Sequence, residues 1–285
     1  MSKLLKEKKP DKETAKRFAE LIAKHNNVPD MALFGRMLEP KKHEKGKKGK
    51  SDTEGEGGEK SKNGDVWKGL ELNVEASLQV AHAISTHEAR PEIDYYVAAD
   101  DIKGEDAGAG YMDEAMFASA CFYKYFSINW ETLVQNLKDN KELAAHTVGA
   151  FIRGAALVNP TGKQNSFAAH NPPDGMLIEI RNSPISYANA FAKPANTDEL
   201  DIISQSIAQL GQYAHDLDIG YGKPSNRFWF SHNLRYPLNV VEDKKENALA
   251  ENNIKSLDEL IRAVVKVAGH DWEEVKKVSV ATEVA

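Results

Sequence analysis

Residues 161–194 read TGKQNSFAAHNPPDGMLIEIRNSPISYANAFAKP. The stretch begins with a basic residue beside an amide, Lys163-Gln164, and continues with an aromatic residue, Phe167, and an Asn-Pro-Pro-Asp turn. After the turn, the apolar run at residues 176–180 predicts a short strand. This mixture suits a backbone that contacts a polar polymer while it stays anchored to a sheet.

Helices are predicted on both sides of this stretch. Residues 130–137 and 143–157 read as helices, and four apolar residues of the second share one face: Ala144, Val148, Phe151 and Ala155. Asn159-Pro160 ends that helix, because the residue before a proline disfavours helical backbone angles. Further on, SLDE at residues 256–259 forms a capping box before a terminal amphipathic helix.

The segment between residues 70 and 129 predicts sheet with one excursion. Residues 70–85 are expected to form a strand, and the apolar residues 115–129 are expected to rejoin the sheet. Between them, residues 92–110 mix tyrosines with Asp100-Asp101 and three glycines, which is typical of a long excursion rather than a core element.

Residues 12–25 predict an N-terminal helix, since four apolar residues recur at helical spacing after Pro10-Asp11: Ala15, Phe18, Ala19 and Ile22. Lys16, Arg17 and Lys24 lie off this stripe. They are expected to form an ordinary solvated face; the alternative, which only a family resemblance implies, is a set of lysines offered to duplex DNA.

Residues 40–62 change the composition abruptly. Residues 40–50 hold six lysines and one glutamate, whereas residues 51–59 hold four acidic residues and three glycines. Because nothing here could bury apolar area, we predict a disordered charged loop over residues 39–69. The loop is interpreted as a solubilising insertion, with a binding device as the alternative.

Composition limits the class of protein. The chain has 285 residues, 41% of them apolar, and its formal net charge is −6. Its one cysteine, Cys121, excludes intramolecular disulfides and fits a reducing compartment. No run of eighteen apolar residues occurs, so we expect a cytoplasmic protein without a membrane partner. The acidic total does not exclude nucleic-acid binding, which depends on a local basic stripe, but it argues against tight binding by the chain alone.

Two patterns suggest a zinc site or a phosphate-binding loop, but neither has the residue spacing that such a site requires. His82 and His87 are five residues apart, so they do not share a helical face as a zinc pair does. Gly162-Lys163 lacks the phosphate-loop glycine five residues earlier, where Leu157 stands, and is followed by Gln164 instead of Ser or Thr.

A catalytic set is likewise not visible. Asp94, Asp100 and Asp101 lack the partner spacing of a metal-dependent nuclease and are interpreted as solvated acids. Cys121 stands between Ala120 and Phe122, so a buried apolar thiol is the expected state. We therefore predict no catalytic residue, no metal site and no cofactor.

Four further blocks carry a family resemblance: MALFGRML at residues 31–38, VEASLQVAHAISTH at 74–87, EIDYYVAADD at 92–101 and GAGYM at 108–112. Together with residues 161–194, they resemble the CasC family, the backbone subunit of the type I-E CRISPR Cascade. The resemblance runs from about Val28 to at least Tyr221. The chain looks like a family member that lacks the first third, including the N-terminal strand and helix.

The resemblance implies an α+β fold. It predicts an antiparallel palm of the RNA-recognition, ferredoxin-like type over residues 70–285, with a thumb at about residues 88–114 and a C-terminal helix. Residues 1–38 correspond to a remnant of the family's helical finger region. The family's missing first strand belongs inside the palm sheet.

The resemblance also implies a function without catalysis. Several copies of such a subunit bind crRNA along its spacer, beside other Cascade subunits, so that base pairing recognises the target DNA. The expected partners are therefore crRNA, target DNA, further copies of the chain and other Cascade subunits. The alternative is a truncated or split member that assembles with Cascade subunits without binding guide RNA.

Family positions supply the candidate residues. For RNA binding, the resemblance points to Arg36, Met37, Lys163, Gln164, Asn165, His170 and Asn171. For base displacement by the thumb, it points to Val97, Tyr111 and Met112. Without the family, Arg36-Met37 reads as a surface arginine and a core methionine. With it, Met37 is expected to be an apolar wedge beside a displaced base, with phosphate contacts offsetting the unstacking cost.

Replacing residues 40–62 by a short Gly-Ser linker should leave the melting temperature almost unchanged. The loop buries nothing, and loop-closure entropy depends only weakly on length. Thermal unfolding of the two proteins checks this, and a loss equivalent to several kcal/mol would show that the loop packs against the fold.

Overall fold

The structure is a computed structural model that describes residues 16–17, 20–21, 27–37, 73–98, 111–196, 201–242, 245–250 and 253–272. The predicted charged loop at 39–69 and most of the predicted helix at 12–25 lie outside these residues, although Lys16, Arg17, Glu20 and Leu21 are helical. The chain divides into two compact units, residues 1–79 with 127–148 and residues 80–126 with 149–285. No helix in the described part is long and apolar enough to span a membrane.

The first unit is organised around the carbonyl oxygen of Ala32, near the end of helix α2 (Pro29–Phe34). This oxygen accepts hydrogen bonds from the hydroxyl of Ser77 at 2.7 Å and from the amide of Asn136 at 3.0 Å. Ser77 precedes strand β1 (Leu78–Val80), and Asn136 ends helix α3 (Trp130–Asn136). A carbonyl that the helix end leaves unpaired therefore joins three segments.

The two predicted helices after residue 129 are confirmed. The side chain of Asn129 caps α3 by accepting a hydrogen bond from the Thr132 amide. Helix α4 (Lys141–Leu157) begins two residues before its predicted start, because the side chain of Asn140 accepts a hydrogen bond from the Leu143 amide. Local polar side chains thus set both helix starts.

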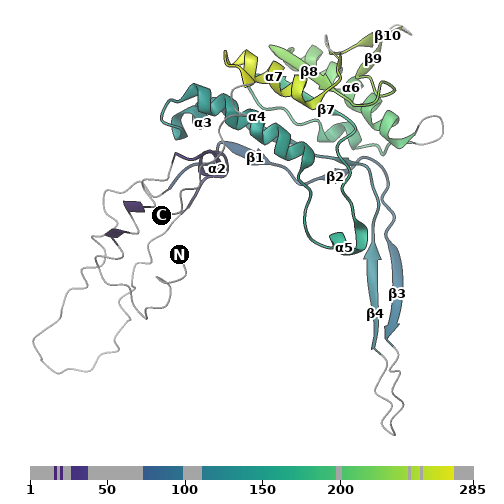
Figure 1. The fold of residues 1–285 in the computed structure, drawn as a ribbon. Helices are drawn as coiled ribbons and strands as arrows, with labels where there is room; N and C mark the ends of the chain where they lie inside the picture. The colour runs from purple at the N-terminus through teal and green to yellow at the C-terminus, as the bar shows by residue number, and fades with distance from the viewer. Residues whose placement is uncertain are drawn as a thin grey trace, which may run out of the picture. The chain divides into compact units, whose positions relative to one another are not determined.

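The second unit contains a long antiparallel hairpin, seen at the lower right of Figure 1. Strands β3 (Glu92–Ala98) and β4 (Tyr111–Phe117) pair in register from Glu92 with Phe117 to Ala98 with Tyr111. Before and after the hairpin, β2 (Ile84–Ser85) pairs with β5 (Phe122–Tyr123), and β1 pairs with β6 (Phe126–Ile128). Part of the predicted excursion at 92–110 is thus regular strand, and residues 99–110 lie outside the description.

The body of the second unit is a three-stranded sheet in the order β11-β8-β7. Its strands are β7 (Met176–Ile180), as predicted, β8 (Asn226–Phe230) and β11 (Asn253–Ile254). A further hairpin joins β9 (Asn239–Glu242) to β10 (Lys245–Ala248). The mixed helix and strand content confirms the predicted α+β class. The sheet itself is mixed rather than purely antiparallel, because β11 joins β8 in parallel.

Helices cover this sheet, as Figure 1 shows. Helix α6 (Ile202–Tyr221) packs with the buried Trp229 in one apolar cluster, and α7 (Leu257–Val267) lies against β8 and β11. The predicted cap of α7 is confirmed, since the Ser256 hydroxyl accepts a hydrogen bond from the Glu259 amide. The residue after the predicted turn, Gly175, has to be glycine for a steric reason: a Cβ at this position would lie 2.2 Å from the Trp229 ring.

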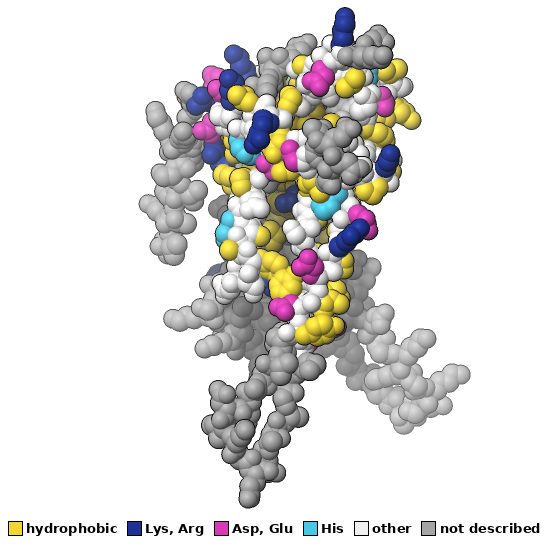
Figure 2. Space-filling model, turned by 90° about the vertical axis from the view of Figure 1, so that its right-hand side faces the viewer, with side chains coloured by type: hydrophobic (Ala, Val, Ile, Leu, Met, Phe, Trp, Pro, Cys, Tyr) yellow, Lys and Arg dark blue, Asp and Glu magenta, His cyan; other side chains and the backbone are white. Residues whose placement is uncertain are grey.

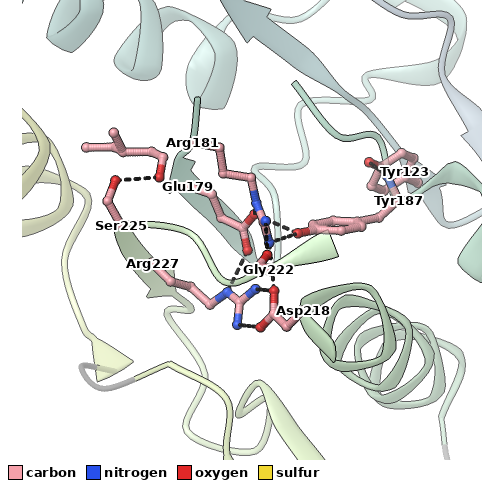
Figure 3. A network of polar contacts seen from close by, with 9 residues as sticks. Tyr123, Glu179, Arg181, Tyr187, Asp218, Gly222, Ser225 and Arg227 are labelled. Atoms are coloured by element: carbon pink, nitrogen blue, oxygen red, sulfur yellow. Dashed lines mark hydrogen bonds and ion pairs between the residues drawn. The ribbon is translucent and has the colours of Figure 1, made fainter. Parts of the chain in front are cut away.

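A buried ion network joins these elements (Figure 3). Arg227 of β8 donates two hydrogen bonds to Asp218 of α6, at 2.7 and 2.8 Å, and one at 2.5 Å to Glu179, its cross-strand partner on β7. Arg181 donates to the same two carboxylates at 2.6 and 2.7 Å. The side chains of all four residues are at most 10% exposed, so each charge depends on the others for neutralisation.

The network also takes in Tyr187, whose hydroxyl donates a hydrogen bond to Glu179 at 2.6 Å. Burial raises the pKa of Tyr187, and the bond to Glu179 adds to this, so the tyrosine stays a neutral donor. Burial alone would raise the pKa of Asp218, but its hydrogen bonds with Arg227 and Arg181 hold that pKa below its usual value. Asp218 therefore stays ionised in the folded protein.

Asp218→Asn should destabilise the fold by about 3–5 kcal/mol at neutral pH, because two buried arginines lose a shared carboxylate. Urea unfolding measures this. The carboxylate's pKa is lowered by folding, so its contribution is present above the unfolded pKa of about 3.9 and is lost as the pH falls further. The difference between wild type and variant should therefore narrow below about pH 4.

Asp216→Asn is the matched control, since Asp216 lies on the same helix but is exposed. It should change stability by no more than about 0.5 kcal/mol. Equal effects of the two substitutions would contradict the importance of the network.

Candidate nucleic-acid interface

Five of the predicted RNA-binding residues lie in one surface segment, residues 160–171, which we call the α5 segment. It contains the four-residue helix α5 (Gln164–Phe167) and five candidates: Lys163, Gln164, Asn165, His170 and Asn171. All but Gln164 are exposed. The structure therefore presents these polar side chains together on one loop.

The backbone of the α5 segment is held in a costly conformation. Lys163 and Ala168, at the two ends of the helix, have φ of 55° and 46°, in the left-handed region that non-glycine residues seldom adopt. The side-chain Nε2 of Gln164 donates a hydrogen bond to the Pro160 carbonyl at 2.7 Å. The Oε1 atom of the same side chain is buried without a hydrogen-bond partner. Such local costs are often found where a loop is shaped for a ligand.

The hairpin meets the α5 segment through an aromatic contact that sequence reasoning missed. The rings of Phe117, at the last position of β4, and Phe167 have centroids 5.3 Å apart, at an interplanar angle of 55°. This tilted geometry is favourable for aromatic pairs. No periodicity could have revealed it, because fifty residues separate the two phenylalanines.

The hairpin itself has one apolar face. Ile93 and Met116 are cross-strand partners, and Tyr95 follows on the same face; all three side chains are exposed. Figure 2 shows apolar side chains gathered on the described part of the hairpin, with acidic ones beside them. The two strands contain four acidic residues and no lysine or arginine, so the hairpin offers apolar contact rather than phosphate neutralisation.

The three predicted thumb residues lie on these strands. Val97 and Met112 are cross-strand partners, and Tyr111 is the partner of Ala98, so the structure brings the three together at the far end of the paired strands. Their side chains lie outside the description.

The side chains of His87 and Thr86 form hydrogen bonds with Cys121, which join the two chain segments just outside the β3–β4 hairpin. The Cys121 amide donates a hydrogen bond to Nε2 of His87 at 3.0 Å, and Nδ1 of His87 bonds the Glu88 carbonyl at 2.9 Å. The Thr86 hydroxyl donates a hydrogen bond to the Cys121 carbonyl at 3.3 Å, and the Thr86 backbone amide donates to the same oxygen at 2.9 Å. Both ring nitrogens of His87 are engaged, so this histidine has a structural role.

Arg36 and Met37 lie in the first unit. Arg36 forms an antiparallel bridge with Val74, with two backbone hydrogen bonds of 2.8 Å. The Met37 side chain is 81% exposed, which excludes the core interpretation of this methionine. Gly35 makes the geometry possible, because its φ is 71° and a Cβ would lie 2.7 Å from the Val74 oxygen and the Ala76 nitrogen.

Comparisons with known proteins place these features in context. The model of a family described as CT1975-like protein matches residues 66–263. A solved chain described as "CRISPR RNA-guided surveillance complex, pre-nicking" is 27% identical with a TM-score of 0.65, over 88% of this chain and 58% of that one. This chain thus spans less than two thirds of that chain's length.

A second solved chain, described as "CRISPR RNA-guided surveillance complex", is 26% identical with a TM-score of 0.61. That likeness covers 90% of this chain and 84% of the other. A search of curated proteins finds no match to the sequence.

Gly35→Ala should destabilise the first unit by more than about 1 kcal/mol, because alanine is strained at this φ and its Cβ meets backbone atoms. Hydrogen exchange of the Arg36 amide should rise as its bond to Val74 weakens. As a control, Gly154→Ala in α4 meets no atom within 4 Å and should be neutral or stabilising by up to about 1 kcal/mol. An unchanged exchange rate at Arg36 would argue against the constraint.

Proposed function

The chain belongs to the family of CT1975-like proteins, and from this premise we propose that it is a backbone subunit of the CasC type in a type I-E CRISPR Cascade. In this role it binds crRNA along its spacer and supports recognition of target DNA. Similarity to chains of CRISPR RNA-guided surveillance complexes supports the CRISPR effector role.

The observation that carries the RNA-binding part is the α5 segment. Its exposed lysine, amide and imidazole side chains suit contacts to phosphate and 2′-OH groups, which hold RNA without reading its sequence. The apolar face of the neighbouring hairpin suits contact with bases. Met37, exposed on the first unit, supplies a second apolar side chain for displacing a base.

In this role the chain carries out no chemical step. Its contribution is to hold the guide, with further copies of itself and other Cascade subunits as partners, while base pairing recognises the target. Strand cleavage then falls to another protein.

A second candidate function is favoured by charge. The net charge of −6 and the acidic hairpin are unusual for a protein that holds RNA through phosphates. In this alternative, the chain assembles with Cascade subunits without binding guide RNA. The complex can be purified from cells that express all subunits and a guide. If the chain binds the guide, the amount of protected guide RNA in the complex should rise in proportion to the amount of this chain; in the alternative it should not.

Lys163→Ala and Met37→Ala should fail in different ways in the reconstituted complex. Lys163→Ala should weaken guide binding and lower the slope of log K against log salt by about one unit, since one phosphate contact is lost. Met37→Ala should leave that slope unchanged and alter the periodic chemical reactivity of the guide, because an uncharged wedge is removed.

Circular dichroism provides the control for this comparison. Both side chains are exposed, so neither substitution should unfold the chain. Identical salt slopes for Lys163→Ala and wild type would contradict the phosphate contact, and unchanged guide reactivity in Met37→Ala would contradict the wedge.

A further inference from the structure

We propose that the Phe117–Phe167 contact is a positioning device, which sets the RNA-binding α5 segment relative to the hairpin. The inference rests on the proposed function and adds to it Phe117, which no sequence pattern identified, as the partner of Phe167. The contact would keep the α5 segment and the β3–β4 hairpin at a fixed distance from each other.

The first observation is that one aromatic pair makes the described link, among polar and ring contacts, between the α5 segment and another element. Its hydrogen bonds in the described structure stay within residues 160–170, from Pro160 with Gln164 to Ala168 with His170. Of all hydrogen bonds, ion pairs and ring contacts that the described residues 160–171 make, the contact between Phe117 and Phe167 alone reaches another element. The ring pair is therefore the specific contact that can hold Lys163 and Asn165 relative to the hairpin.

The second observation is where Phe117 lies. It is the last residue of β4 and pairs with Glu92, the first residue of β3, so its ring lies at the base of the hairpin. Its face is opposite to the apolar face that carries Ile93 and Met116, since side chains alternate along a strand. One face of the hairpin thus contacts the α5 segment, while the other stays available for a ligand.

The third observation is that the chain beyond Phe117 is fixed. The Cys121 backbone bonds to Thr86 and His87, and the hydroxyl of Tyr123 accepts a hydrogen bond from the Tyr187 amide at 3.0 Å. The hairpin base is therefore connected to the buried ion network through Tyr187. A ring attached to this base contacts the strained α5 helix and favours the conformation that the structure shows.

The test compares guide binding by complexes that carry Phe167→Ala, Phe167→Tyr or wild-type chain. An aromatic pair of this kind corresponds to about a three- to tenfold change in affinity. We expect Phe167→Ala to weaken guide binding by about that factor, to lower the salt slope by up to about one unit because Lys163 is no longer held at its phosphate, and to disturb the periodic reactivity of the guide. Phe167→Tyr keeps the ring and should restore all three properties.

Phe122→Ala is the matched control. Phe122 is also an exposed phenylalanine, on β5, and makes no ring contact with the α5 segment. It should leave guide binding and guide reactivity as in wild type. Because Phe167 is itself 42% exposed, all these variants should fold, and the melting temperature of each free chain checks that they do.

A double substitution tests the coupling directly. If the two rings act as one device, Phe117→Leu combined with Phe167→Ala should weaken guide binding no more than the stronger single change. In the free chain, Phe117→Leu should also speed hydrogen exchange of the Phe167 and Ala168 amides. These amides form hydrogen bonds within the α5 segment, so their exchange reports an effect that is transmitted from the hairpin.

The outcomes separate this inference from the proposed function. A wild-type complex that retains no guide RNA would overturn the proposed function, and the positioning role with it. A wild-type complex that binds guide, together with a Phe167→Ala complex that binds it equally well and with the same reactivity pattern, would overturn the positioning role alone.

Discussion

Four charged side chains buried in the second unit can exist there only by neutralising one another, and the arrangement of the surrounding elements follows from this constraint. Glu179 and Arg227 face each other across β7 and β8, and Asp218 reaches them from α6. Removing a single ion from water costs several kcal/mol, so the two strands and the helix are favoured only in the positions that complete the network. Apolar packing around Trp229 stabilises the same elements but tolerates small shifts. The ion network does not, because its hydrogen bonds require fixed distances and directions.

From this body, rigidity extends to the base of the hairpin. Tyr187 belongs to the network through its hydroxyl and bonds Tyr123 through its amide, so the strand that leaves the hairpin is attached to the ionic centre. The His87 imidazole replaces a backbone acceptor for Cys121 just outside the hairpin, where the Thr86 carbonyl is already used by Ala195. A two-stranded ribbon is marginally stable by itself. Its firm attachment at the base compensates for the absence of a third described strand beside β3 and β4.

The interface divides its tasks among separate elements. Charge and amide groups lie on the α5 segment, and the apolar surface lies on a hairpin that carries only acidic charges. Under the proposed function, this separation would let a chain of acidic total charge contact RNA, since a local set of polar contacts matters more than the total charge. The proposed positioning role of the contact between Phe117 and Phe167 follows from it, because two surfaces that bind one ligand together must keep a fixed distance.

The sequence by itself determined those elements whose signals are local. The helices after Asn129 and Asn140, the strand at residues 176–180 and the cap at Ser256 follow from side chains within a few residues of each other. The family blocks likewise indicated the cluster of polar candidates around Lys163. Tertiary structure alone decided the partners that are distant in the chain. Glu179 and Arg181 look like ordinary strand-end charges until α6 and β8 supply Asp218 and Arg227, and nothing near Phe117 indicates Phe167. Such contacts depend on how elements dock, and docking is set by the packing of the whole unit rather than by any spacing along the sequence.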